Sequence, residues 1–181
     1  MDPRMVPVGR LFARLLLHEM DASMLAELRT PEIVRALEDV GVRVPCDATV
    51  DELAVDYCER ILRPAAVAPP VQSLWQGGEY EGDCARAVRE LARYCAFEFS
   101  AAAARGAPVD HVGSILLLWC EAVEDGRFDV ATRIAMHHLA WVEPALRVAS
   151  EGGGFYGDVC AAVIAWCRQV SAPSTVSPVD R

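Results

Sequence analysis

The sequence predicts a single all-α domain, a bundle-like arrangement of six to seven helices. Apolar residues recur every three to four positions along most of the chain, which is the period of a helix with one buried face. Proline, glycine and capping residues divide this pattern into segments of helical length, and no stretch shows the alternation expected of a half-buried strand. With 181 residues, of which 53% are apolar and 24% charged, the chain can bury one sizeable core.

The chain before residue 64 is expected to hold four helices, each with its own start signal. A short polar side chain at a helix start accepts a hydrogen bond from a free backbone N–H, and proline fits the first helical position. The first helix is expected over about Val8 to Met20. The later starts are marked by Asp21 or Ser23, by Thr30 followed by Pro31, and by the capping box Thr49–Glu52.

Residues 64–82 differ in kind because they combine three prolines and three glycines with large apolar side chains such as Leu74, Trp75 and Tyr80. The apolar side chains predict a long loop that is ordered against the body of the protein. Ordered loops of this length are often functional. Trp75 either anchors this loop or forms a wall of a binding groove.

The second half is expected to supply the remaining helices, and the helical domain is expected to span residues 1–171, followed by a flexible tail over 172–181. The Ser- and Pro-rich composition predicts the tail. The first of these helices is expected to be capped by Asp83 and to end at Gly106, and the next to start at Pro108 and end at Gly126. A third helix is expected over about Asp129 to Ser150, where Pro144 kinks or splits it. After a break at Gly152–Gly154, the last helix is expected from Phe155 to Val170.

Charge and cysteine content limit the classes of partner. The net charge of −9 disfavours nucleic acid, whose affinity comes mainly from basic side chains that neutralise phosphates. It weakly favours a basic partner such as an arginine-containing peptide, although solubility alone is the commoner explanation. The seven cysteines are odd in number and contain no CxxC pair, which indicates reduced, mostly buried thiols in a cytoplasmic protein.

No targeting or membrane segment is evident. Arg10 and Arg14 interrupt the first apolar stretch, and the run from Ile115 to Trp119 is far shorter than the ~20 residues of a membrane-spanning helix. The phosphate-loop, dinucleotide, zinc-protease and nucleophile-elbow motifs are all missing from the sequence. We therefore expect no cofactor, no metal ligands, no catalytic residues and no stable insertion into a membrane.

The dipeptide Asp110–His111 is the strongest chemical candidate. It is expected in the first turn of the helix after Pro108, where the helix dipole favours an acidic side chain by ~0.3–1 kcal/mol and disfavours protonation of His111. From spacing alone, a structural role for the pair is favoured over a functional one. The functional alternative is a general acid–base pair.

Several motifs resemble those of the twin-arginine redox enzyme maturation chaperones and follow one another in the same order as in that family. This family includes the dedicated chaperones of trimethylamine N-oxide reductase, dimethyl sulfoxide reductase and nitrate reductase. The resemblance runs from about Leu11 to Cys167. The chain departs from the family pattern at two positions: the family often has an aromatic residue where this chain has Val71, and it commonly has Glu where this chain has Ile115. The matching motifs are Leu11–Leu16, the PPxxSxW segment Pro69–Trp75, Gly82–Asp83, the PxDHxx segment Pro108–Gly113, His137–Trp141 and Phe155–Tyr156.

The resemblance implies a TorD-like helical fold and a cytoplasmic chaperone, not an enzyme. Such a chaperone binds the twin-arginine leader, the body, or both, of a molybdopterin oxidoreductase subunit until its cofactor is inserted. The groove implied for the client peptide is lined by Ser73, Leu74, Trp75, Asp110 and His111. Leu74 and Trp75 would give apolar contact, Asp110 would pair with an arginine or a backbone N–H of the client, and His111 would hydrogen-bond the client or the loop.

This hypothesis requires the proline-rich connector to fold back beside the start of the Asp110 helix. Two alternatives stay open: a helical adaptor or regulatory protein without leader specificity, and an enzyme that uses Asp110 and His111. A homodimer formed by exchange of helices is compatible with this kind of fold, and so is a monomer.

Overall fold

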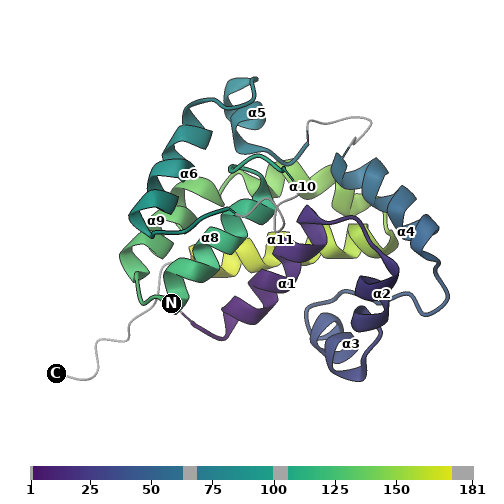
Figure 1. The fold of residues 1–181 in the computed structure, drawn as a ribbon. Helices are drawn as coiled ribbons and strands as arrows, with labels where there is room; N and C mark the ends of the chain where they lie inside the picture. The colour runs from purple at the N-terminus through teal and green to yellow at the C-terminus, as the bar shows by residue number, and fades with distance from the viewer. Residues whose placement is uncertain (1, 63–68, 100–105, 173–181) are drawn as a thin grey trace.

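The computed structural model describes residues 2–62, 69–99 and 106–172, which form an all-α fold without a strand (Figure 1). This confirms the predicted fold class. These described residues contain ten α-helices, more than the six to seven expected, because several segments fold as separate short helices. The elements are α1 (Met5–Leu17), α2 (Ala22–Leu28), α3 (Pro31–Glu38), α4 (Val50–Tyr57), the π-helical turn η1 (Cys58–Leu62), α5 (Gln72–Gly77), α6 (Asp83–Tyr94), α8 (Val112–Glu124), α9 (Phe128–His138), α10 (Val142–Glu151) and α11 (Gly154–Ser171).

Helix α8 lies at the centre of the core, with ten of its thirteen residues buried. Helix α1 packs along it, and α11 passes behind α1 (Figure 1). Small residues allow this close approach: a Cβ at Gly9 would lie 2.8 Å from Cys120 Sγ, and a Cβ at Gly113 would lie 2.6 Å from Leu17. The position of the α1 end against the start of α8 is therefore fixed by packing, and this junction is where the site described below is built.

The caps predicted before residue 64 are largely confirmed. The Asp21 carboxylate accepts a hydrogen bond from Met24 N at 2.8 Å, and Thr49 and Glu52 form a complete capping box. Pro31 is the first residue of α3, although the Thr30 side chain does not cap that helix. The Tyr57 hydroxyl at the end of α4 donates to Leu16 O at 2.9 Å, which ties α4 to α1.

The sequence predicted a helix over Asp129 to Ser150 that is either kinked or split at Pro144, and in the structure this helix is split. Helix α9 ends at His138 and α10 begins at Val142, so Pro144 occupies the first turn of α10, where its missing N–H costs nothing. The predicted break at Gly152–Gly154 separates α10 from α11 and is confirmed.

Arg60 explains why the break between α10 and α11 is rich in glycine. Its guanidinium donates to Ala149 O at 2.9 Å and to Gly152 O at 3.0 Å, which satisfies carbonyls at the end of α10. Its partner Asp56 accepts from Tyr156 N at 3.0 Å in the first turn of α11. A Cβ at Gly152 would overlap the guanidinium, so only glycine leaves room for it.

Three predicted boundaries in the middle of the chain are wrong, and one of them is the helix start expected at Pro108, since α8 begins at Val112. Helix α6 ends at Tyr94 and does not continue to Gly106, because Ala96 has a positive φ of 53° that reverses the backbone. Asp83 is the first residue of α6, and Gly82, without a capping side chain, occupies the N-cap position. Within the predicted loop 64–82, residues Gln72–Gly77 form α5; residues 63–68 and 100–105 and the tail after 172 lie outside the described residues.

Among the described residues, no helix has the length and apolar character needed to cross a lipid bilayer.

Candidate functional site

The proline-rich connector folds back beside the start of α8, as the sequence hypothesis required. Val71 and His111 form an isolated antiparallel bridge. It is flanked by two backbone hydrogen bonds, from Gln72 N to Asp110 O at 3.0 Å and from Val112 N to Pro70 O at 2.9 Å. Two motifs almost forty residues apart in the sequence therefore meet in one place.

The two residues of the bridge have no free backbone group for a further strand among the described residues. Val71 and His111 form a non-hydrogen-bonded antiparallel pair, in which the N–H and C=O groups of both residues point away from the partner. Here each of these groups bonds within its own segment: Val71 N to Pro69 O, Trp75 N to Val71 O, His111 N to Pro108 O, and Ile115 N to His111 O. The backbone groups of Val71 and His111 are therefore not available to an added strand.

Asp110 faces away from solvent and caps α5. Its side chain is completely buried, and its Oδ2 accepts a hydrogen bond from Ser73 N, in the first turn of α5, at 2.7 Å. Val71, the N-cap residue of α5, has no side chain that could do this. Asp110 Oδ1 and Ser73 Oγ, both buried, have no hydrogen-bond partner among the described residues. The expectation that Asp110 presents its carboxylate to a client is therefore not met by this geometry.

His111 caps α8 and is held neutral. It precedes the helix rather than lying in its first turn, and its Nδ1 accepts from Gly113 N at 3.1 Å. Burial lowers the pKa of His111 to about 4, outweighing the opposing effect of the Asp110 charge. The neutral state was predicted from the helix dipole, whereas burial is the main cause. Because Nδ1 accepts a hydrogen bond, the ring proton must be on Nε2.

Gln72 fixes the other side of α5, a role that the sequence analysis missed. Its Nε2 donates to His137 O at 3.0 Å, and its Oε1 lies 2.8 Å from His138 Nδ1. Burial also lowers the pKa of His138 to about 4, so this neutral ring donates through Nδ1. In the sequence, only the position of Gln72 next to Ser73 in the PPxxSxW segment could have indicated this role.

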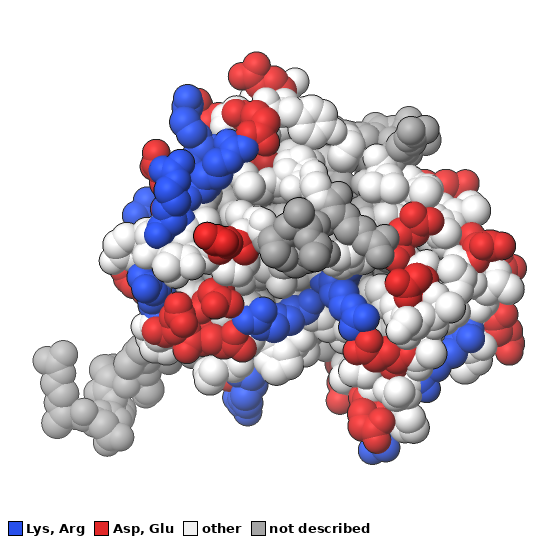
Figure 2. Space-filling model, viewed as in Figure 1, with Lys and Arg blue, Asp and Glu red and all other residues white. Residues whose placement is uncertain are grey.

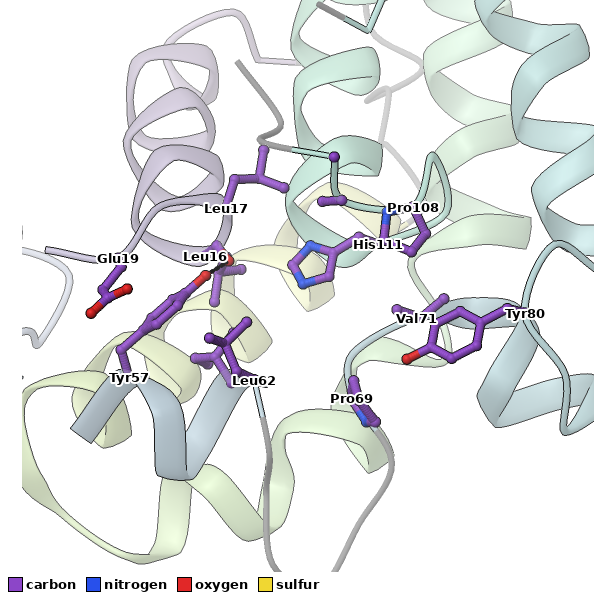
Figure 3. Close-up of a pocket in the computed structure, with 13 residues that line it drawn as sticks. Leu16, Leu17, Glu19, Tyr57, Leu62, Pro69, Val71, Tyr80, Pro108 and His111 are labelled. Atoms are coloured by element: carbon purple, nitrogen blue, oxygen red, sulfur yellow. Dashed lines mark hydrogen bonds between the residues drawn. The ribbon is translucent and has the colours of Figure 1, made fainter. Parts of the chain in front are cut away.

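A cavity of about 350 Å³ opens beside the bridge (Figure 3). Ligand cavities in proteins commonly measure about 300–1,000 Å³, so this one is at the small end. The His111 ring points into it from the start of α8, toward the end of α1 (Figure 3). The described residues that line it are Leu16, Leu17, Glu19, Tyr57, Ile61, Leu62, Pro69, Val71, Tyr80, Gly106, Ala107, Pro108 and His111.

Of the five residues predicted to line a groove, only His111 lines this cavity. Ser73 and Asp110 are buried behind it, and Leu74 and Trp75 are half-buried on α5. The Trp75 indole donates from Nε1 to Pro69 O at 3.1 Å and packs against the core. These contacts favour the anchoring role for Trp75 over the wall of a groove.

The charge around the cavity is uneven. Glu19 is exposed at the rim beside Tyr57, just after the C-terminal end of α1, where the helix dipole is negative. Acidic side chains predominate over the neighbouring part of the surface formed by α2, α3 and α4, and arginines gather over α6 on the opposite side (Figure 2). The α1 end of the cavity is thus the one that favours a cation.

The described part of the chain contains no group of three His, Cys, Asp or Glu residues placed to hold a metal ion. All seven cysteines are free, and four of them are buried: Cys95, Cys120, Cys160 and Cys167.

No protein-family model matches the sequence, and no curated protein matches it either. Membership of the chaperone family therefore stays a prediction from the motif resemblance described above.

Proposed function

We propose that this protein is a cytoplasmic chaperone that binds the twin-arginine leader of a molybdopterin oxidoreductase subunit, with or without the body of that subunit. One observation carries the proposal. The two most specific motifs of the resemblance, Pro69–Trp75 and Pro108–Gly113, are hydrogen-bonded to each other at the edge of an apolar cavity. Because the two distant motifs meet beside one cavity, this cavity is where we propose that the leader binds.

The apolar walls of the cavity suit side chains of an extended peptide as its occupant. Leu16, Ile61 and Val71 supply aliphatic walls suited to the apolar stretch of a leader. Burial of one large aliphatic side chain would contribute about 1.5–3 kcal/mol to binding.

The charge distribution suits the basic head of such a leader. The net charge of −9 and the acidic surface over α2 to α4 would attract arginines and raise the rate of association, more at low than at high salt.

The acid–base alternative receives little support from the geometry. In a catalytic dyad the carboxylate would accept a hydrogen bond from the histidine ring. Here Asp110 Oδ2 accepts from Ser73 N, and Oδ1 has no partner among the described residues. His111 Nδ1, the nitrogen that would face an orienting carboxylate, accepts from Gly113 N instead.

Titration of a synthetic twin-arginine leader by calorimetry tests the proposal. Leu62→Trp should place a larger side chain in the cavity and weaken binding at least tenfold. Val148→Trp is the matched control, because Val148 on α10 is as exposed as Leu62 but does not line the cavity, so its affinity should equal that of the wild type. A leader that shows no affinity for the wild-type protein would refute the proposal, and capture of partners that lack such leaders would favour the adaptor.

A further inference from the structure

Two side chains give the otherwise mainly apolar cavity a specific polarity. His111 and Glu19 both belong to the lining; His111 immediately precedes α8, and Glu19 lies two residues after the end of α1 (Figure 3). The Tyr57 hydroxyl between them is already engaged as a donor to Leu16 O. Among the side chains of the described lining residues, the polar demands of a ligand are therefore set chiefly by one N–H donor and one carboxylate.

His111 can only donate into the cavity. Its Nδ1 is committed to Gly113 N, and the neutral ring carries its single proton on Nε2. A neutral N–H donor in an apolar cavity is matched by a neutral acceptor, because burial of an ionised acceptor there would be costly. In a peptide, the acceptor present at every residue is the main-chain carbonyl.

Glu19 sets the opposite requirement at the rim. It follows the last turn of α1, whose C-terminal carbonyls carry a partial negative charge. A guanidinium or ammonium group held there interacts favourably with both the carboxylate and the helix end. An anionic group would be repelled.

We propose that the cavity selects an extended peptide by three simultaneous contacts: an aliphatic side chain between the apolar walls, a main-chain carbonyl on the Nε2–H of His111, and a basic side chain on Glu19. This inference rests on the proposed function and assigns a separate part of the peptide to each residue. It also distinguishes the two members of the Asp110–His111 dipeptide, since only His111 contacts the ligand.

The substitution His111→Asn separates binding from folding. Asparagine is among the best N-cap residues, so its side-chain oxygen can accept from Gly113 N as the imidazole does. Its shorter side chain removes the donor that points into the cavity. We expect the melting temperature to stay within a few degrees of the wild type, while the affinity for the leader peptide falls about fivefold, the usual loss for one neutral hydrogen bond.

The substitution Glu19→Gln tests the cation. The affinity for the leader peptide should fall about threefold at low salt, in the range of an exposed ion pair, and the remaining affinity should depend less on salt. With a leader whose arginines are replaced by norleucine, the wild type and Glu19→Gln should bind equally. Replacement of single peptide amides by esters, which weakens the carbonyl acceptor, should identify one position whose effect disappears in His111→Asn.

The outcomes separate this inference from the proposed function. If the leader binds the wild type and both variants with the same affinity, the three-contact inference is overturned and the leader-binding function stands. If the leader fails to bind while a basic aliphatic peptide of unrelated sequence binds with the losses given above, the recognition chemistry stands and the leader-binding function falls.

Discussion

Asp110 should act on stability through α5 rather than through a ligand, and this can be measured. Removal of the carboxylate in Asp110→Ala leaves Ser73 N, at the start of α5, without its acceptor. Loss of an N-cap costs about 0.5–2 kcal/mol, and a hydrogen bond to a charged group contributes about 1.5–3 kcal/mol. The buried Oδ1 has no partner among the described residues, so removing it recovers part of this loss. We therefore expect a net destabilisation of about 2 kcal/mol.

For a domain of this size, 2 kcal/mol corresponds to a fall in melting temperature of about 4–8 °C. Urea unfolding followed by circular dichroism gives the free energy directly. Asp110→Asn keeps an oxygen that can accept from Ser73 N and should lose less than 1 kcal/mol. Ser73→Ala is the matched control: its amide is retained and only an unpartnered buried hydroxyl is removed, so stability should be unchanged or slightly higher.

An Asp110→Ala protein as stable as the wild type would refute this account of α5. A Ser73→Ala protein destabilised as much as Asp110→Ala would show that the hydroxyl, not the backbone amide, carries the interaction.

Three further predictions concern titration, packing and thiol reactivity. Burial lowers the pKa of His111 from 6.5 to about 4, so the unfolded chain binds the proton more readily. Stability is therefore full above pH 6.5 and falls by roughly 3 kcal/mol towards pH 4, a loss that His111→Asn should reduce in melting curves recorded across this range. Gly152→Ala should displace Arg60 and lower the free energy of unfolding in urea by about 1–3 kcal/mol. Gly77→Ala is the control, because a Cβ there meets open space and should not lower the stability. Equal decreases in the free energy of unfolding for the two variants would contradict the packing argument. Native labelling with iodoacetamide and mass spectrometry should leave the four buried thiols unmodified, since burial raises the pKa of each: Cys95, Cys120, Cys160 and Cys167. Early modification of any of these four thiols would contradict their burial.

The features predicted well from the sequence are those determined by neighbouring residues. The cap at Asp21 and the capping box Thr49–Glu52 depend on atoms within three positions, so the residue types suffice to identify them. The end of α6 was missed because the apolar period continues past it to Phe99. The reversal at Ala96 uses a conformation that alanine rarely adopts, and nothing in the local sequence indicates it.

The cavity could not be read from the sequence for a different reason. Leu16, Tyr57 and Ile61 occupy apolar positions of helical stripes and look like ordinary core residues. They line the cavity only because the ends of α1 and α4 meet the connector, and that meeting depends on long-range packing such as the contact of Gly113 with Leu17. The motifs indicated where the connector would fold but not what would lie opposite it.

Asp110 and His111 show how adjacent residues of one motif can have different tasks. Partners across an antiparallel bridge point to the same face. His111 has extended dihedral angles and pairs with Val71, so these two share a face and both line the cavity. Asp110 lies in the turn before the bridge and Gln72 is the first residue of α5, so the alternation of an extended strand does not determine where their side chains point. Their positions are instead set by hydrogen bonds to Ser73 N and His137 O, which depend on how α5 and α9 pack and which the motif does not indicate.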